Sequence, residues 1–184
     1  MFFLLLAACG SEQSAEPVDI DTRAHRIAAS SIIVDTHIDA PYRLMARPED
    51  VSQATMNGDF DYPRAVAGGL NAPFMSIFTP AELEGTGKSK ATADQLINVV
   101  EGIAAANPGK FAVATSVADV RSQFEDGLIS LPMGMENGAP LEGDLENLRH
   151  FYDRGIRYLS LCHGSANHLS DSSYDANHRW NGIS

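Results

Sequence analysis

Short apolar segments alternate with longer amphipathic segments along the chain, and this alternation restricts its fold more than any other feature. The apolar segments that predict strands are residues 31–35, 71–78, 111–115, 129–135 and 157–162. The segments that predict helices are residues 21–30, 91–106, 116–124 and about 145–152. Apolar strands that alternate with helices form a parallel sheet with helices packed on its faces, so we expect an α/β fold.

Two parallel architectures fit this alternation, an open doubly wound sheet and a (β/α)8 barrel of the TIM type. The first strand is not followed by a glycine-rich phosphate loop, which weakens the dinucleotide-binding version of the open sheet. A barrel takes roughly 250 residues, whereas this chain has 184. The barrel interpretation therefore implies that only the N-terminal part is present, about strands 1–5.

Charge and composition exclude some classes of protein. The formal net charge of -11 argues against nucleic-acid binding, which needs a basic face to neutralise phosphates. Hydrophobic residues make up 44% of the chain, which is typical of a globular protein. The chain has no apolar run long enough to span a bilayer and no Gly-x-Ser-x-Gly hydrolase motif.

The N-terminus resembles a bacterial lipoprotein signal. Residues 1–8 are apolar and end in small residues, and Cys9 follows in a lipobox-like Leu-Ala-Ala-Cys sequence. We predict that residues 1–8 are removed, that Cys9 is lipidated, and that residues 9–19 are a polar tether to a barrel portion at 20–184. This places the protein in a bacterial cell envelope, lipid-anchored or otherwise extracytoplasmic. The alternative is a merely apolar N-terminus without signal function.

Residues that can bind a metal follow three of the predicted strands. His37 and Asp39 are two residues apart at the end of the first strand, where side chains at i and i+2 point the same way. Glu136 ends the fourth strand and His163 the fifth. Parallel α/β folds place their active sites at the carboxyl ends of strands, so we expect these four side chains to form one site.

Other polar residues are given structural roles. We interpret His25 and His150 as structural or exposed. His168 and His178 are interpreted as exposed loop residues, with the alternative that they line the mouth of a site. Cys162 is interpreted as a packing residue of the fifth strand, because no base is suitably spaced to activate it. Residues that could orient the site are Asp35, Asn167 and Asp171, the last being equally typical of a turn.

Several collinear motifs together resemble the membrane dipeptidase (renal dipeptidase) family over about residues 20–184. These motifs are residues 34–39, 60–64 with 68–69, 134–138, 151–159, 161–163, 165–168, 171–172 and 179–184. The resemblance implies a zinc-dependent, amidohydrolase-type barrel that hydrolyses dipeptides through a metal-activated water at a two-zinc site. It further implies that His37 and Asp39 bind one Zn2+, that Glu136 bridges both ions, and that His163 contacts the substrate and polarises the scissile carbonyl.

The family also supplies two later histidine ligands, an aspartate and a substrate-binding arginine, which have no match in this sequence. We therefore expect the 184-residue chain alone to be inactive as a dipeptidase. Two alternatives stay open: a non-catalytic lipoprotein half-barrel that binds or scaffolds, and another metal-dependent amidohydrolase. The expected partners are a dipeptide substrate and, through Cys9, a membrane; a homodimer stays open as the assembly.

Overall fold

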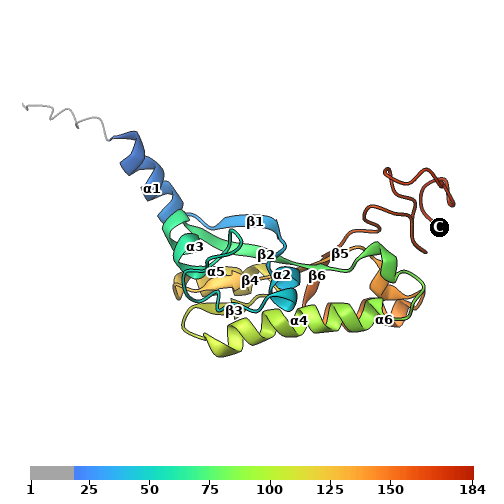
Figure 1. Cartoon of the computed structure of the whole chain (residues 1–184). Helices are drawn as coiled ribbons and strands as arrows, with labels where there is room; N and C mark the ends of the chain where they lie inside the picture. Colours follow the sequence, from blue (N-terminus) through green and yellow to red (C-terminus); the bar gives the residue numbers. More distant parts are fainter. Residues whose placement is uncertain (1–18) are drawn as a thin grey trace, which may run out of the picture.

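Parallel strands and covering helices alternate along the chain, as the sequence predicts, in a computed structural model that describes residues 19–184 (Figure 1). The strands are β1 (Ile33–Ile38), β2 (Leu70–Phe78), β3 (Phe111–Val113), β4 (Ile129–Leu131), β5 (Met133–Glu136) and β6 (Ile156–Leu159). The helices are α1 (Ile20–Ser30), α2 (Ala40–Ala46), α3 (Tyr62–Gly68), α4 (Ser89–Ala106), α5 (Val117–Glu125) and α6 (Leu145–Asp153), with short 3-10 helices η1 (Ala81–Leu83) and η2 (Ala139–Leu141).

The main sheet has four strands in the order β1-β2-β5-β6, and every neighbouring pair is parallel. Its core lies between the central strands and α4, which runs along one side of the sheet (Figure 1). Met75, Ile77 and Met133 are fully buried there, as are Leu96 and Ile97 of the helix. Burial of a side chain of this size stabilises a fold by about 1.5–3 kcal/mol, so this contact is a main source of stability.

The predicted strand at residues 129–135 is wrong as a single element. The chain divides at Pro132 into β4, which pairs with β3 in a separate two-stranded sheet, and β5, which lies between β2 and β6. Proline has no N–H group to donate to a ladder, so it interrupts a central strand. The carbonyl of Pro132 still accepts a hydrogen bond from the Met75 N–H at 2.8 Å, which joins the two halves to β2.

Three other strand ends differ from the prediction. β1 runs on to Ile38 rather than ending at residue 35, so His37 lies inside it. β3 ends at Val113. β6 ends at Leu159, three residues earlier than predicted, because the chain turns where the Asn137 N–H donates to the Ser160 hydroxyl at 2.9 Å.

The predicted helices are all present. Ser116 caps α5 by accepting a hydrogen bond from the Asp119 N–H at 3.1 Å, as the Ser-x-x-Asp spacing at the start of this helix favours. In α6 the predicted apolar face is only partly buried, since Phe151 is 1% exposed but Tyr152 is 60% exposed. The prediction missed α2 and α3, although Asp61 caps α3 and both helices carry proline in their first turn.

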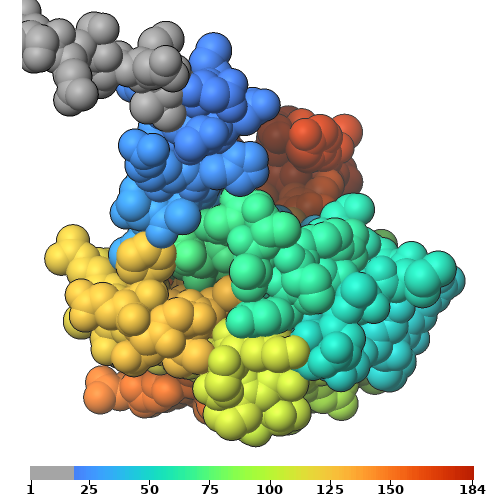
Figure 2. All heavy atoms as spheres, turned by 90° about the vertical axis from the view of Figure 1, so that its left-hand side faces the viewer, coloured from blue at the N-terminus to red at the C-terminus, as the bar shows by residue number. Residues whose placement is uncertain are grey.

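Helix α1 buries none of its residues and projects from the body of the protein (Figures 1 and 2). An apolar hollow of about 470 Å3 lies at this end of the molecule, between β1, the start of α5 and Pro132. None of the helices between residues 19 and 184 has the length and apolar character that crossing a membrane requires. The predicted signal and Cys9 lie outside the described residues.

Candidate metal centre

His37, Asp39 and Glu136 form a cluster at the carboxyl edge of the main sheet. One ligand atom from each side chain lies within 4.8 Å of the other two. The His37 Nε2 atom is 3.4 Å from Asp39 Oδ1 and 3.1 Å from Glu136 Oε2. An imidazole nitrogen and two carboxylates at this spacing are a donor set that suits Zn2+.

Parallel pairing explains why residues about 100 positions apart in the sequence meet. β1 and β5 flank β2 on its two sides, and Glu136 is in register with Phe78 at the end of β2. We expected the side chains of His37 and Asp39 to point the same way at positions i and i+2 of an extended strand, and this prediction is wrong for Asp39. It has left the strand and occupies the N-cap position of α2, with φ of -82° and ψ of 24°.

His163 joins this cluster from the loop after β6. Its prediction as a strand-end residue is wrong, since β6 ends four residues earlier, but its Nε2 atom lies 3.1 Å from Glu136 Oε1. Its ring packs edge-on against Phe78 with centroids 5.2 Å apart. The Ser76 hydroxyl donates to Glu136 Oε2 at 2.9 Å. Glu136 is thus held by contacts on both oxygens, with one imidazole on each side.

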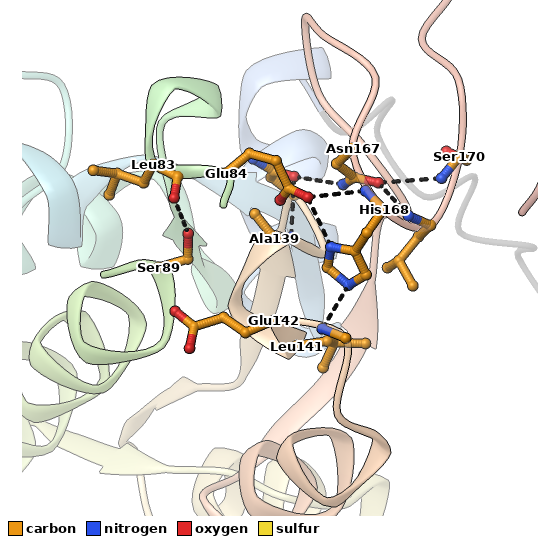
Figure 3. Close-up of polar contacts among 12 residues, drawn as sticks. Leu83, Glu84, Ser89, Ala139, Leu141, Glu142, Asn167, His168 and Ser170 are labelled. Carbon is orange, nitrogen blue, oxygen red and sulfur yellow. Dashed lines mark hydrogen bonds and ion pairs between the residues drawn. The ribbon is translucent and has the colours of Figure 1, made fainter. Parts of the chain in front are cut away.

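Buried amides fix the loop that carries His163. The Asn167 side chain donates to Asn137 Oδ1 at 3.0 Å and to the Leu161 carbonyl at 2.7 Å. Its own oxygen accepts from the N–H groups of Leu169 and Ser170 (Figure 3). Because Asn137 directly follows Glu136, this network ties the His163 loop to the end of β5. Asn167 therefore holds the loop of His163 in place, and its predicted role in orienting the site stays a prediction.

His168 has a structural role, and its prediction as an exposed loop residue is wrong. Its Nδ1 atom lies 2.9 Å from Glu84 Oε1, and its backbone N–H donates to the same oxygen (Figure 3). Its Nε2 atom accepts a hydrogen bond from the Gly143 N–H at 3.2 Å. His168 therefore joins the loops that follow β2, β5 and β6.

Tyr158 contacts the other nitrogen of His37, Nδ1, although no pattern in the sequence indicated Tyr158 as a site residue. Its hydroxyl lies 3.2 Å from His37 Nδ1 and donates to the Thr36 carbonyl at 3.1 Å. Burial, followed by the negative charge of Glu136 and other nearby carboxylates, raises the pKa of the Tyr158 hydroxyl. Ser76 was also missed. No spacing in the sequence relates either residue to His37 or Glu136, because only strand pairing brings them together.

The remaining candidates lie around the site or away from it. Asp35 Oδ1 accepts a hydrogen bond from the His37 N–H at 3.0 Å, so Asp35 holds the backbone that carries His37. Burial tends to raise the pKa of Asp171, but backbone N–H donors of Gly182 and its neighbours hold it below its usual value, so Asp171 joins two segments of the C-terminal loop rather than forming a local turn. Cys162 is not in a strand; its thiol donates to the Asp171 carbonyl at 3.1 Å.

The other histidines are consistent with structural or exposed positions. The His150 Nε2 atom lies 2.8 Å from Asp94 Oδ1, and His25 contacts the Asp21 carbonyl within α1. His178 is exposed. None of them is part of the metal-binding group found among residues 19–184.

A cavity of about 630 Å3 opens beside the cluster and gives it access to solvent. Its lining includes His37 of β1, Asp39 at the start of α2, and Arg43, Phe60 and Arg64. Metal ions that act in catalysis need a position open to water or substrate. The exposed side chain of Asp39 and this cavity meet that requirement.

A parallel α/β sheet with a His-Asp-Glu cluster at its carboxyl edge, able to hold a metal ion, is typical of α/β proteins of the TIM-barrel type. The chain belongs to the membrane dipeptidase family (peptidase family M19), whose sequence profile matches residues 21–184. The expected family and fold class are therefore confirmed.

Individual relatives agree with this assignment. An uncharacterized dipeptidase of Schizosaccharomyces pombe is 27% identical over 179 residues, which cover 89% of this chain and 44% of the relative. The crystal structure of a probable dipeptidase, PvdM, from Pseudomonas aeruginosa is similar with a TM-score of 0.79 and 22% identity, over 88% of this chain and 44% of that protein. A metallo peptidase from Rhodobacter sphaeroides, solved with a phosphinate mimic of the dipeptide L-Ala-D-Ala, has a TM-score of 0.68 and 23% identity, over 76% of this chain and 48% of its own. The chain thus spans less than half the length of these relatives.

Proposed function

We propose that this chain supplies the first ligands of a two-zinc centre that hydrolyses dipeptides. The observation that supports this most directly is the convergence of His37, Asp39 and Glu136 within 4.8 Å at the strand edge. The donor chemistry fits zinc, and Glu136 has one oxygen toward each imidazole. The membership of the chain in a dipeptidase family supports the reaction class.

In this proposal His37 and Asp39 would hold one ion, and Glu136 would help to hold both that ion and a second one. When bound, the zinc ions supply Lewis-acid activation of a water and of the scissile carbonyl. Ser76 donates to Glu136 and holds its carboxylate in place. His163 is about half exposed, which leaves its ring open to a substrate. It donates a hydrogen bond to the carbonyl oxygen as negative charge develops there.

The dipeptide substrate is proposed from the relatives. Several of them are named dipeptidases, and one solved relative holds a phosphinate mimic of L-Ala-D-Ala. These names favour a dipeptide over the non-peptide amides or esters of other metal-dependent amidohydrolases. The ligands for the second ion that the family resemblance implies have no counterpart in this sequence, so the 184-residue chain alone is expected to be inactive.

The test compares the native protein, purified from its source cells and loaded with Zn2+, with the recombinant 184-residue chain. We expect the native protein to hydrolyse Gly-containing dipeptides or L-Ala-D-Ala and His37→Ala to abolish this activity. His178→Ala changes an exposed histidine outside the cluster and is the matched control. Absence of dipeptide hydrolysis by the zinc-loaded native protein would refute the proposal and favour a non-catalytic binding module.

We also propose that Cys9 anchors the protein to the bacterial cell envelope through attached lipid. The support is the apolar segment at residues 1–8 followed by the lipobox-like sequence. Cys9→Ser should move the protein from the membrane fraction to the soluble fraction. Unchanged fractionation of that variant would contradict the lipid anchor.

A further inference from the structure

Tyr158 reaches across one face of the sheet from one edge strand to the other. It lies on β6, whereas its hydroxyl contacts Thr36 and His37 on β1. The strand order is β1-β2-β5-β6, so the ring passes over both central strands. Phe74 of β2 packs against it with centroids 5.4 Å apart.

Gly134 makes this path available. It lies on β5 in register with Ser76 on one side and Tyr158 on the other. A Cβ atom at position 134 would lie 2.0 Å from Tyr158 Cζ and 2.1 Å from its Cε1. Only glycine lets the ring lie this close to the strand, so Gly134 and Tyr158 form one structural unit.

An irregularity in β1 presents its backbone to the tyrosine. Asp35 pairs with Pro73 and Ile38 with Met75, so β1 has one residue more than β2 between these pairs. Pro73 has no N–H for the ladder, which accounts for the interruption. Bulges near active sites re-aim side chains and backbone groups. Here the bulge contains Thr36 and His37. The Thr36 carbonyl accepts a hydrogen bond from the Tyr158 hydroxyl.

We propose that Tyr158 is a positioning residue for the metal centre. It fixes the His37 ring so that Nδ1–H faces the tyrosine and Nε2 faces the metal. The hydroxyl has one proton, and it donates that proton to the Thr36 carbonyl. Its oxygen can then only accept from His37 Nδ1, 3.2 Å away. The lone pair of the imidazole is thereby left on Nε2, the atom that faces Asp39 and Glu136.

This inference rests on the proposed metal centre and deepens it. Its test uses Zn2+ alone as the probe and the full chain as the protein. Zinc affinity is measured by competition with a chromophoric chelator for wild type, Tyr158→Phe, Tyr152→Phe and His37→Ala. Tyr152→Phe is the matched control, because it removes the same hydroxyl from an exposed ring on α6.

We expect Tyr158→Phe to weaken zinc binding about 10- to 100-fold, the usual effect of losing such an outer partner. Tyr152→Phe should bind zinc like wild type. Equal affinity of Tyr158→Phe and wild type would refute the role of Tyr158 while leaving the metal centre intact. Absence of zinc binding that depends on His37 would instead refute the metal centre, and this inference with it.

A second measurement does not depend on how the variant folds. Nitrogen-15 NMR of the imidazole groups in the zinc-loaded wild-type chain should show His37 protonated at Nδ1 and ligated through Nε2. A merely structural role for Tyr158 would not set this pattern. Ligation through Nδ1 would overturn the inference.

Discussion

Replacing Gly134 with alanine should destabilise the protein, although alanine generally suits regular structure better than glycine. The added Cβ atom would lie 2.0–2.5 Å from three ring carbons of Tyr158, well inside contact distance. Keeping the ring in place costs about 1–3 kcal/mol or more in overpacking. Moving it breaks two hydrogen bonds and one aromatic contact, each worth about 1 kcal/mol. The two routes together predict a loss of about 1–3 kcal/mol.

Urea unfolding, followed by circular dichroism, measures this loss. Gly102→Ala is the control, because Gly102 lies in the exposed interior of α4 with no atom near its added Cβ. That change should stabilise the chain by about 0.5–1 kcal/mol. In a Tyr158→Ala background the cost of Gly134→Ala should largely disappear, since the clash has been removed. Equal effects of Gly134→Ala in both backgrounds would refute the coupling of Gly134 to Tyr158.

Other predictions concern acid, the His163 loop and metal removal. The Arg64 hydrogen bond, first among several, holds the pKa of Asp61 well below its usual range. The ionised Asp61 carboxylate therefore contributes its full stabilisation above about pH 4, and this contribution declines as the pH falls further. Asp61→Asn should flatten this decline in urea midpoints, and an unchanged pH profile would contradict the assignment. Asn167→Ala should speed amide hydrogen exchange in residues 160–170 but not in α4; uniform protection would argue against the amide network. Zn2+ at 100 times its Kd should stabilise the folded chain by about 2.7 kcal/mol, and chelation or His37→Ala should remove this gain; a zinc effect that persists in His37→Ala would place the ion elsewhere.

Local signals in the sequence were sufficient for most elements. The spacing of apolar residues in α4 and the Ser116 cap of α5 predict both helices, because such patterns act through neighbours along the chain. Errors occurred where a partner strand decides the outcome. Pro132 does not merely weaken one strand but separates two, since the segments on either side of it pair with different neighbours.

The candidate site shows the same division. His37, Asp39, Glu136 and His163 could be identified from the sequence, because each is a polar residue near the end of an apolar strand. The route by which His163 reaches Glu136 could not, since it depends on a loop that the buried Asn167 amide ties to Asn137 at the end of β5. Helix α3 was missed even though Asp61 and the following proline are ordinary helix-start signals.

The sequence by itself determined most of the order of strands and helices, the parallel arrangement that follows from it, and the identity of the metal-competent residues. These depend on periodicity and residue chemistry, which act over short distances along the chain. Only the tertiary structure decided that Tyr158 and Ser76 support His37 and Glu136. The contact between Tyr158 and His37 joins residues 121 positions apart. It exists because the order of the strands in the sheet, the small volume of Gly134 and the bulge opposite Pro73 coincide in space.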